Sequence, residues 1–371
     1  AHESAVFSNA VPGQPLAVYM GDDARNEYIY KYVSNAKWDA ADASPANRMA
    51  AGDKYLDNGK LYAARFNSDG TGQWIELSVN TPAIKNFAGY PFADQADVCV
   101  NARLAADAAG ATKMDRPEWC GVNPKNGEVY FTLTNNSNRS LNPTGSAQLL
   151  PDAANPRVYT DMKDGKSQGG NPNGHILRLK EGSGAASATS LTWDVYVFGA
   201  EAGAPASPVN LSNLTDDQDM SSPDGLWFSP YTGICWIQTD DKAYTDKTNC
   251  MMLAALPGQV GDGKQVTLNY PRGNGNLAVQ TQIGKAPTAD TLKRFLVGPS
   301  GCEITGACET PDGKALFINI QHPGEDTAMA DVGNAAKYQS QWPANAGYGP
   351  GKRPRSATIV ITKADGGRIG T

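Results

Sequence analysis

An arginine and a glutamate separated by one proline form the segment of this 371-residue chain with the clearest chemical potential. Arg116 and Glu118 lie within Met114–Trp119, and the proline between them fixes its own φ and disfavours the helical region for the residue before it. A predicted turn at 123–127 and a strand of alternating apolar and polar residues at 129–134 follow. The pair is therefore expected at the mouth of a strand, where β proteins often carry their chemistry. The alternative is an exposed Arg–Glu pair that only caps a hairpin.

Other carboxylates recur at the corners of predicted strands that lie far apart along the chain. Around Glu118, Asp224 and Glu303 the order is the same: a carboxylate corner, an apolar strand, a turn rich in Asn, Asp, Pro and Gly, and a second strand. Loose repetition of short β units is typical of a β-propeller, in which inner-strand ends converge on a central axis. Such convergence would bring four carboxylates to one mouth: Glu3, Glu118, Asp224 and Glu303. Three aspartates are lesser candidates, because adjacent aspartates also occur in solvated turns: Asp22, Asp23 and Asp240.

A cage of carboxylates predicts a metal centre, because without cations the like charges would repel one another and retain protons. Oxygen ligands favour hard cations such as Ca²⁺ and also accept Fe³⁺. Arg116 beside such a centre would offer a planar donor fork to a phosphate or carboxylate substrate. A metal and an arginine acting on one oxyanion are the usual electrostatic requirements of phosphoryl transfer.

The composition favours an all-β protein with many short strands and tight turns. The chain has 39 glycines and 24 prolines, and only 19% of its residues are charged. All-β architectures often reach this length without splitting, so a single β-propeller domain is expected over residues 1–371. A net charge of −6 without a basic block argues against nucleic acid as a partner. No run of 18 apolar residues occurs, so no membrane span is predicted.

One short helical insertion is expected among the strands. Apolar residues recur at helical spacing from Ala93 to Ala108, which predicts an amphipathic helix near 93–108. This helix would either brace the loop that carries Arg116 or form a plain surface insertion. After the strand at 129–134, the region 135–174 is rich in Asn, Pro, Gly and Asp, which predicts an extended loop near one rim.

The six cysteines form an even set without a Cys-x-x-Cys zinc pattern. Their spacing predicts disulfides that close short loops, Cys302–Cys308 and Cys235–Cys250, with Cys99–Cys120 as a third pair. Disulfides would indicate an oxidising compartment, the periplasm or the outside of the cell. Buried thiols scattered through the core are the alternative interpretation.

Several collinear motifs resemble the PhoX family of alkaline phosphatases, and together they cover nearly the whole chain. They are His2-Glu3, Tyr19–Arg25 (YMGDDAR), Met114–Trp119 (MDRPEW), Ser222–Leu226 (SPDGL), Trp236–Asp240 (WIQTD), Glu303–Gly306 (EITG), Asn319–Glu325 (NIQHPGE) and Arg353–Ala357 (RPRSA). The resemblance implies a six-bladed β-propeller, exported from the cytoplasm, that hydrolyses phosphomonoesters with calcium and iron at its axis.

Carried across motif by motif, the resemblance implies a role for each residue of the expected mouth. The metal ligands would be the four corner carboxylates Glu3, Glu118, Asp224 and Glu303, and Arg116 would bind the phosphate of a small phosphomonoester. The implied cofactors are Ca²⁺ and Fe³⁺. The family carries a stretch ahead of the His-Glu motif that includes an iron-ligating cysteine, and no cysteine of this chain has a matching context. This departure puts the iron in question and points to a missing N-terminal segment or an assembly partner.

Two other functions fit parts of the pattern. A calcium-dependent propeller hydrolase of the lactonase type would hold one Ca²⁺ to polarise a lactone carbonyl, but it would need few carboxylates and no axial arginine. A non-catalytic extracellular binding or assembly protein could retain the cage without the reaction. The metal stoichiometry of the purified chain would separate these interpretations.

Overall fold

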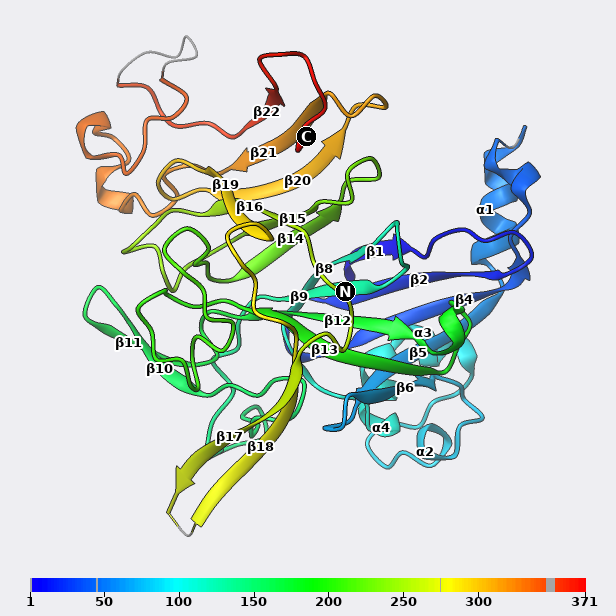
Figure 1. The fold of residues 1–371 in the computed structure, drawn as a ribbon. Coiled ribbons are helices and arrows are strands. Elements are labelled where there is room, and N and C mark those ends of the chain that lie inside the picture. The colour runs from blue at the N-terminus through cyan, green and yellow to red at the C-terminus, as the bar shows by residue number, and fades with distance from the viewer. Residues whose placement is uncertain (1, 45, 274, 345–350) are drawn as a thin grey trace.

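The computed structural model describes residues 2–44, 46–273, 275–344 and 351–371, and most of its regular structure is β (Figure 1). Antiparallel strands that follow one another along the chain pair into meandering sheets. These sheets are the propeller-like units that the turn-rich sequence predicts, so the all-β prediction is confirmed. Within the described ranges, no helix has the length and apolar character needed to cross a membrane.

The largest sheet contains eleven strands, most of them from the N-terminal half of the chain. Its main path follows the order β1-β2-β4-β5-β6-β13-β12-β9-β8, and the hairpin β17–β18 joins it through β13. In that order the strands are β1 (His2–Phe7), β2 (Pro15–Asp22), β4 (Ile29–Lys37), β5 (Gly59–Phe66), β6 (Thr71–Glu76), β13 (Ser190–Phe198), β12 (His175–Glu181), β9 (Val129–Leu133), β8 (Pro117–Val122), β17 (Lys264–Arg272) and β18 (Gly275–Ile283).

Four smaller sheets complete the β structure of the described residues. A four-stranded and a three-stranded sheet form the C-terminal part of the fold, while two-stranded sheets join β3 to β7 and β10 to β11. The bounds are β14 (Pro223–Phe228), β15 (Cys235–Thr239), β16 (Met251–Ala255) and β19 (Leu292–Val297); β20 (Glu303–Glu309), β21 (Ala315–Gln321) and β22 (Ala357–Thr362); β3 (Arg25–Glu27) and β7 (Met114–Asp115); and β10 (Tyr159–Lys163) and β11 (Lys166–Gly170).

The helical insertion expected near 93–108 is present, but as two helices instead of one. Asn101 separates α3 from α4 because its backbone leaves the helical region, with φ −107° and ψ 41°. The buried alanines of α4 pack in a cluster with β2, β4 and β5, so the insertion covers one face of the large sheet. The helices are α1 (Arg48–Leu56), α2 (Pro82–Lys85), α3 (Gln95–Val100) and α4 (Ala102–Ala109), with 3-10 turns at Ala40–Ala43, Gly182–Gly184, Met329–Asp331 and Ala335–Lys337.

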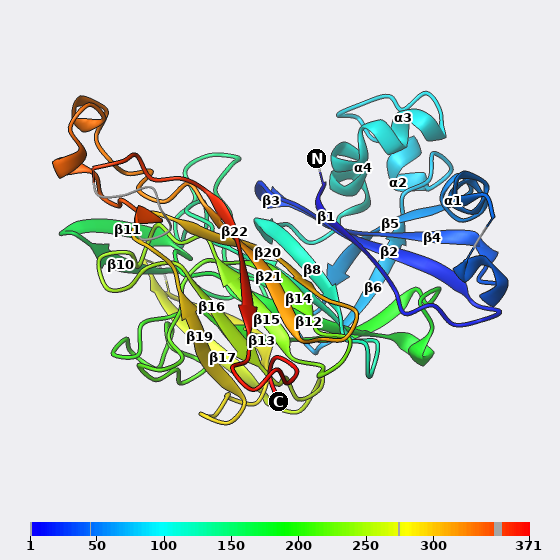
Figure 2. The same ribbon diagram turned by 90° about the horizontal axis from the view of Figure 1, so that it is seen from above.

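Strand β8 connects the sheets at the centre of the molecule. It packs against β1 and β2 on one side and against β14 on the other, and β14 in turn contacts β20 (Figure 2). The neighbouring strand β9 is buried on both faces, in contrast to the half-buried alternation that its sequence predicts. The reason is that β14 packs against β9 and removes the expected solvent-facing side.

The three predicted disulfides are wrong, because all six cysteines are free thiols. Cys235 and Cys250 belong to different hydrophobic clusters, which lie on opposite faces of the β14–β15–β16–β19 sheet. Each of the other two predicted pairs joins a buried cysteine to an exposed one. Cys120 is buried and Cys99 is exposed, and Cys302 is buried and Cys308 is exposed. Sequence spacing cannot show which face of a sheet a cysteine takes, and a disulfide requires both Cβ atoms on the same side.

Candidate active site

The four corner carboxylates of the sequence analysis all lie at the beginnings of strands that pack together. Glu118 is the second residue of β8, and the contacts of β8 with β1 and β14, and of β14 with β20, bring the four strand ends to one region. The others lie at the beginnings of their strands as well: Glu3 is second in β1, Asp224 second in β14 and Glu303 first in β20. The convergence expected for inner-strand ends is therefore present.

A compact group of three carboxylates lies at the centre of this region. Ligand oxygens of Glu3, Asp23 and Glu118 are all within 4.8 Å of one another. Glu118 is 3% exposed, whereas Glu3 is exposed and Asp23 is half-buried. Asp23, a lesser candidate in the sequence, joins the site because the corner after β2 turns it toward β8.

Asp224 and Glu303 extend the same acidic field. Burial raises the pKa of Asp224 well above its ordinary value, and the negative charges of Glu303 and Asp240 raise it further. The pKa of Glu303 is also raised by burial and then by Asp240, while the nearby His322 lowers it. Asp240 therefore belongs to the acidic cluster, because its charge raises the pKa of both Asp224 and Glu303.

Glu118 experiences the same unfavourable environment. Burial and then the charge of Asp224 raise its pKa far above the ordinary value, and Asp23 adds to this rise, whereas Arg116 opposes it. Carboxylates that retain protons for these reasons are stabilised in their charged form by a bound cation. The donor set is entirely oxygen, so the residues fit Ca²⁺.

The residues fit iron less well. Among the described residues, the grouping of possible ligands contains no cysteine or histidine. The thiol of Cys120 on β8 is buried and contacts Ser4 and the Tyr19 carbonyl oxygen. The implied iron would therefore find carboxylate oxygens but no sulfur ligand in this group, whereas calcium needs only the oxygen donors that are present.

Arg116 points its guanidinium into the acidic group. Its Nε donates to Asp23 Oδ1 at 2.7 Å, its Nη2 donates to Asp23 Oδ2 at 2.9 Å, and Nη2 lies 3.1 Å from Glu118 Oε1. The backbone of Arg116 has φ 56°, a left-handed conformation that non-glycine residues adopt rarely and that often marks functional sites. The proline that follows disfavours the right-handed helical region, which explains part of this choice.

Gly21 permits the close approach of the two corners that carry these residues. A Cβ atom at Gly21 would lie 2.9 Å from Pro117 Cβ and 3.1 Å from the Glu118 carbonyl oxygen. Any other residue would therefore push β2 away from β8 and separate Asp23 from Arg116. Sequence reasoning did not identify this requirement, although the Met-Gly-Asp-Asp segment contains it.

Glu303 lies beside a small group of charged side chains, His322, Glu325 and Lys242, that the sequence did not predict as part of the site. His322 Nε2 lies 3.4 Å from Glu303 Oε2, its Nδ1 lies 3.2 Å from Glu325 Oε2, and Lys242 forms an ion pair with Glu325. His322 has φ 37° at the end of β21. The signal was present in the Asn319–Glu325 motif, whose side chains had no assigned role. Asp22, another lesser candidate, is buried and lies 2.5 Å from His2 Nδ1.

Comparisons with known proteins support a relationship over most of the chain. The family model described as alkaline phosphatase PhoX matches residues 1–324. Among solved structures, Pseudomonas fluorescens PhoX in complex with vanadate, a transition-state analogue, matches with 33% sequence identity and a TM-score of 0.72. The match covers 100% of this chain but only 54% of that chain, so this chain spans about half the length of the solved protein. A search of curated proteins gave no significant match.

Proposed function

Because the chain belongs to the PhoX family of alkaline phosphatases, we propose that it hydrolyses small phosphomonoesters at the mouth formed by β1, β8, β14 and β20. One observation carries the proposal: Arg116 lies inside a group of carboxylates from strands that are far apart in the sequence. The similar Pseudomonas fluorescens PhoX structure holds vanadate, a transition-state analogue, which agrees with this reaction type.

Arg116 is proposed to bind the phosphoryl group. Within the described part of the chain its hydrogen bonds use Nε and Nη2, so Nη1 remains for a substrate oxygen. Asp23 holds the guanidinium plane from one side, which reduces the orientational freedom that substrate binding would otherwise have to remove. A fixed cation of this kind stabilises the negative charge that develops on the phosphoryl oxygens.

The carboxylates Glu3, Glu118, Asp224 and Glu303 are proposed to hold calcium, with Asp23 and Asp240 contributing to the negative field. When bound, the cations would neutralise this field and act as Lewis acids toward the phosphoryl oxygens. The carboxylates would hold the cations on β1, β8, β14 and β20, and the hydrogen-bonded sheets of these strands limit their movement. Ferric iron also accepts carboxylate oxygens, but the cysteine ligand that the family resemblance implies for iron is absent from this group of described residues and would have to come from an N-terminal segment or an assembly partner.

The location and partners follow from the same proposal. PhoX-type phosphatases act outside the cytoplasm, and we extend a periplasmic or secreted location to this chain. The substrate is proposed to be a small phosphomonoester and not a nucleic acid, since the net charge is −6. Because all six cysteines are free thiols, disulfides give no support to this location.

The test is hydrolysis of p-nitrophenyl phosphate by the purified chain, with elemental analysis of its metals and with calcium and ferric iron supplied. Arg116→Ala is expected to lower kcat/KM about a hundredfold, because a charge-assisted contact that strengthens in the transition state is worth about 3 kcal/mol. Arg116→Lys retains the charge without the planar fork and should also be clearly impaired.

Arg294→Ala is the matched control. Arg294 has the same side-chain exposure as Arg116, 27%, and likewise pairs with an aspartate, Asp219. It should retain nearly full activity. Equal activity of wild type and Arg116→Ala would refute the proposed role of the arginine. A metal-loaded wild type without phosphatase activity would refute catalysis by this chain alone and favour a binding function.

A further inference from the structure

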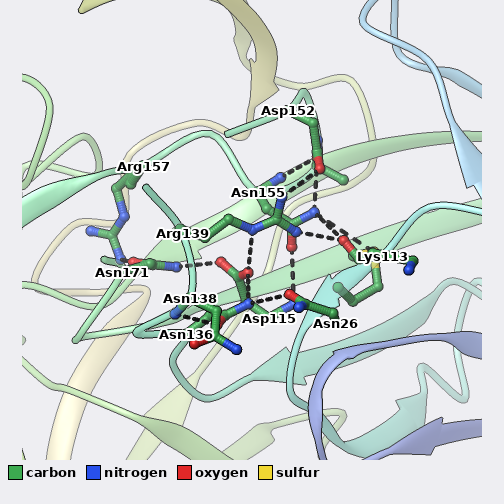
Figure 3. Close-up of polar contacts among 12 residues, drawn as sticks. Asn26, Lys113, Asp115, Asn136, Asn138, Arg139, Asp152, Asn155, Arg157 and Asn171 are labelled. Carbon is green, nitrogen blue, oxygen red and sulfur yellow. Dashed lines mark hydrogen bonds and ion pairs between the residues drawn. The ribbon is translucent and has the colours of Figure 1, made fainter. Parts of the chain in front are cut away.

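A fully buried aspartate beside Arg116 forms the centre of a polar network that the proposed reaction does not use. Asp115 is 0% exposed, and its Oδ1 accepts from Arg139 Nε at 2.7 Å and from Asn136 Nδ2 at 2.9 Å. Its Oδ2 accepts from Asn171 Nδ2 at 3.0 Å (Figure 3). Burial alone would raise the pKa of Asp115, but the adjacent Arg139 and the hydrogen bonds hold it below its ordinary value. The aspartate is thus a charged and fully bonded anchor.

The same network forms hydrogen bonds to the backbone that leads to Arg116. The carbonyl oxygen of Lys113 accepts from Arg139 Nη2 at 2.5 Å and from Asn155 Nδ2 at 3.0 Å. The amide of Asp115 donates to Asn155 Oδ1 at 3.0 Å, and the carbonyl oxygen of Arg116 accepts from the Thr134 amide at 3.2 Å. The backbone before the left-handed Arg116 is therefore fixed by hydrogen bonds to the region 135–174, and the carbonyl group of Arg116 itself is fixed by the end of the strand before that region.

The network also reaches the corner that carries the partner of Arg116. Asn136 Nδ2 donates to Asn26 Oδ1 at 3.1 Å, and Asn26 is the central residue of β3. Strand β3 pairs with β7 in the register Arg25 to Asp115. Asp23 lies two residues before β3, so one buried cluster connects the backbone of Arg116 to the backbone of Asp23.

We propose that Asp115, together with Arg139 and Asn136, is the positioning residue of Arg116. The inference rests on the proposed phosphatase function, because it assigns the purpose of the network to the orientation of the phosphate-binding arginine. The polar region 135–174, which the sequence analysis interpreted only as a rim loop, thereby becomes the base of the site. A backbone at φ 56° persists only when its surroundings hold it there, and this network supplies the constraint.

The experiment compares Asp115→Asn with Asp194→Asn in the metal-loaded protein. Asp194 is the matched control, because it is also buried and receives Nε and Nη2 of an arginine, Arg178, at 2.6 and 3.0 Å. Its other described bond, from the Gly261 amide, lies outside the network around Arg116. Each variant removes the negative charge of a buried ion pair, so both should lower the stability of the fold. Only Asp115→Asn should also disturb the position of Arg116.

Asp115→Asn is expected to lower kcat/KM for p-nitrophenyl phosphate roughly tenfold to a hundredfold, the effect of a small misplacement of a catalytic group. Bound calcium should be unchanged. In the background of Arg116→Ala the same substitution should change kcat/KM less than about twofold, because residues that act through one group are not additive. Asp194→Asn should leave kcat/KM within about twofold of wild type in either background. Equal losses in the two aspartate variants, or multiplicative effects of Asp115→Asn and Arg116→Ala, would overturn the proposal.

Hydrogen exchange gives a readout that does not depend on activity. The amides of 112–119 should exchange faster in Asp115→Asn than in Asp194→Asn, and unchanged exchange there would overturn the proposal even if the wild type has no phosphatase activity. If Asp115→Asn fails to fold, Asn26→Gly replaces it, since glycine accepts the φ of 68° at that position. That variant removes the bond from Asn136 and the bond that Asn26 Nδ2 donates to the Ala147 carbonyl oxygen at 2.7 Å, while Asp115 and Arg139 stay in place. It should lower kcat/KM several-fold; full activity with unchanged exchange at 112–119 would overturn the proposal.

Discussion

Glu118→Gln should change the pH dependence of stability in a way that reports directly on the acidic site. In the metal-free protein, burial and the charge of Asp224 raise the pKa of Glu118 far above its value in the unfolded chain, about 4.3. The folded chain therefore retains a proton that the unfolded chain releases, and stability falls as pH rises above about 4.3. One such proton lowers the free energy of unfolding by about 1.4 kcal/mol per pH unit.

The magnitude follows from this slope. Between pH 5 and pH 8 the linked proton of Glu118 should reduce the free energy of unfolding by about 4 kcal/mol. With an unfolding entropy of about 2.1 cal/mol/K per residue, this corresponds to about 5 °C in Tm for a chain of 371 residues. Glutamine imitates the protonated carboxyl group, so Glu118→Gln should lose this part of the pH dependence. Calcium should displace the proton and flatten the wild-type profile.

The assay is calorimetric unfolding at several pH values between 5 and 8, with a chelator and with calcium. In chelator, the Tm of wild type should fall more steeply with pH than that of Glu118→Gln. In calcium, wild type should gain stability and the variant should gain much less. Parallel Tm profiles in chelator, or an equal gain from calcium in both proteins, would refute the reasoning that Glu118 is a proton-retaining metal ligand.

Three further predictions concern the same region. Asp224→Asn and Glu303→Gln should each lower the bound calcium, measured by elemental analysis. At a calcium concentration of about 100 times Kd, each should also lower Tm by up to about 3 °C, measured by calorimetry. Unchanged calcium content in both variants would contradict their assignment as ligands. Asp23→Asn should lower kcat/KM about tenfold, since the amide side chain lacks the negative charge and keeps only one of the two oxygens that accept from Arg116 at 2.7 and 2.9 Å. An additive effect in Arg116→Ala would contradict this. Gly21→Ala should lower stability by about 1–3 kcal/mol and activity as well, and a variant of wild-type stability would show that the corners can separate freely.

The positions of three of the four corner carboxylates, Glu118, Asp224 and Glu303, could be predicted from the sequence because each stands at a corner where an apolar strand begins. Glu118 and Asp224 stand one residue inside β8 and β14, and strand periodicity locates such residues reliably. Their convergence required the further assumption of a propeller-like arrangement. The pairing of Asp23 with Arg116 could not be chosen in advance, because adjacent aspartates at a corner are common in ordinary turns.

Other features depend on tertiary packing that local patterns do not contain. The burial of both faces of β9 results from β14, which lies far along the chain. The disulfide predictions failed because Cys235 and Cys250 occupy opposite faces of one sheet. The network around Asp115 was missed because its residues belong to a loop whose Asn-rich composition predicts only turns.

Competitive inhibition by vanadate tests the central claim most directly, because it measures recognition of a phosphoryl-like anion separately from substrate turnover. The calcium-loaded wild type and Arg116→Ala should be compared at equal bound calcium. Vanadate should inhibit residual hydrolysis by Arg116→Ala roughly a hundred times more weakly than hydrolysis by wild type, in line with the loss of about 3 kcal/mol. An unchanged inhibition constant would contradict the claim that Arg116, within the carboxylate mouth, is the group that recognises the phosphoryl anion.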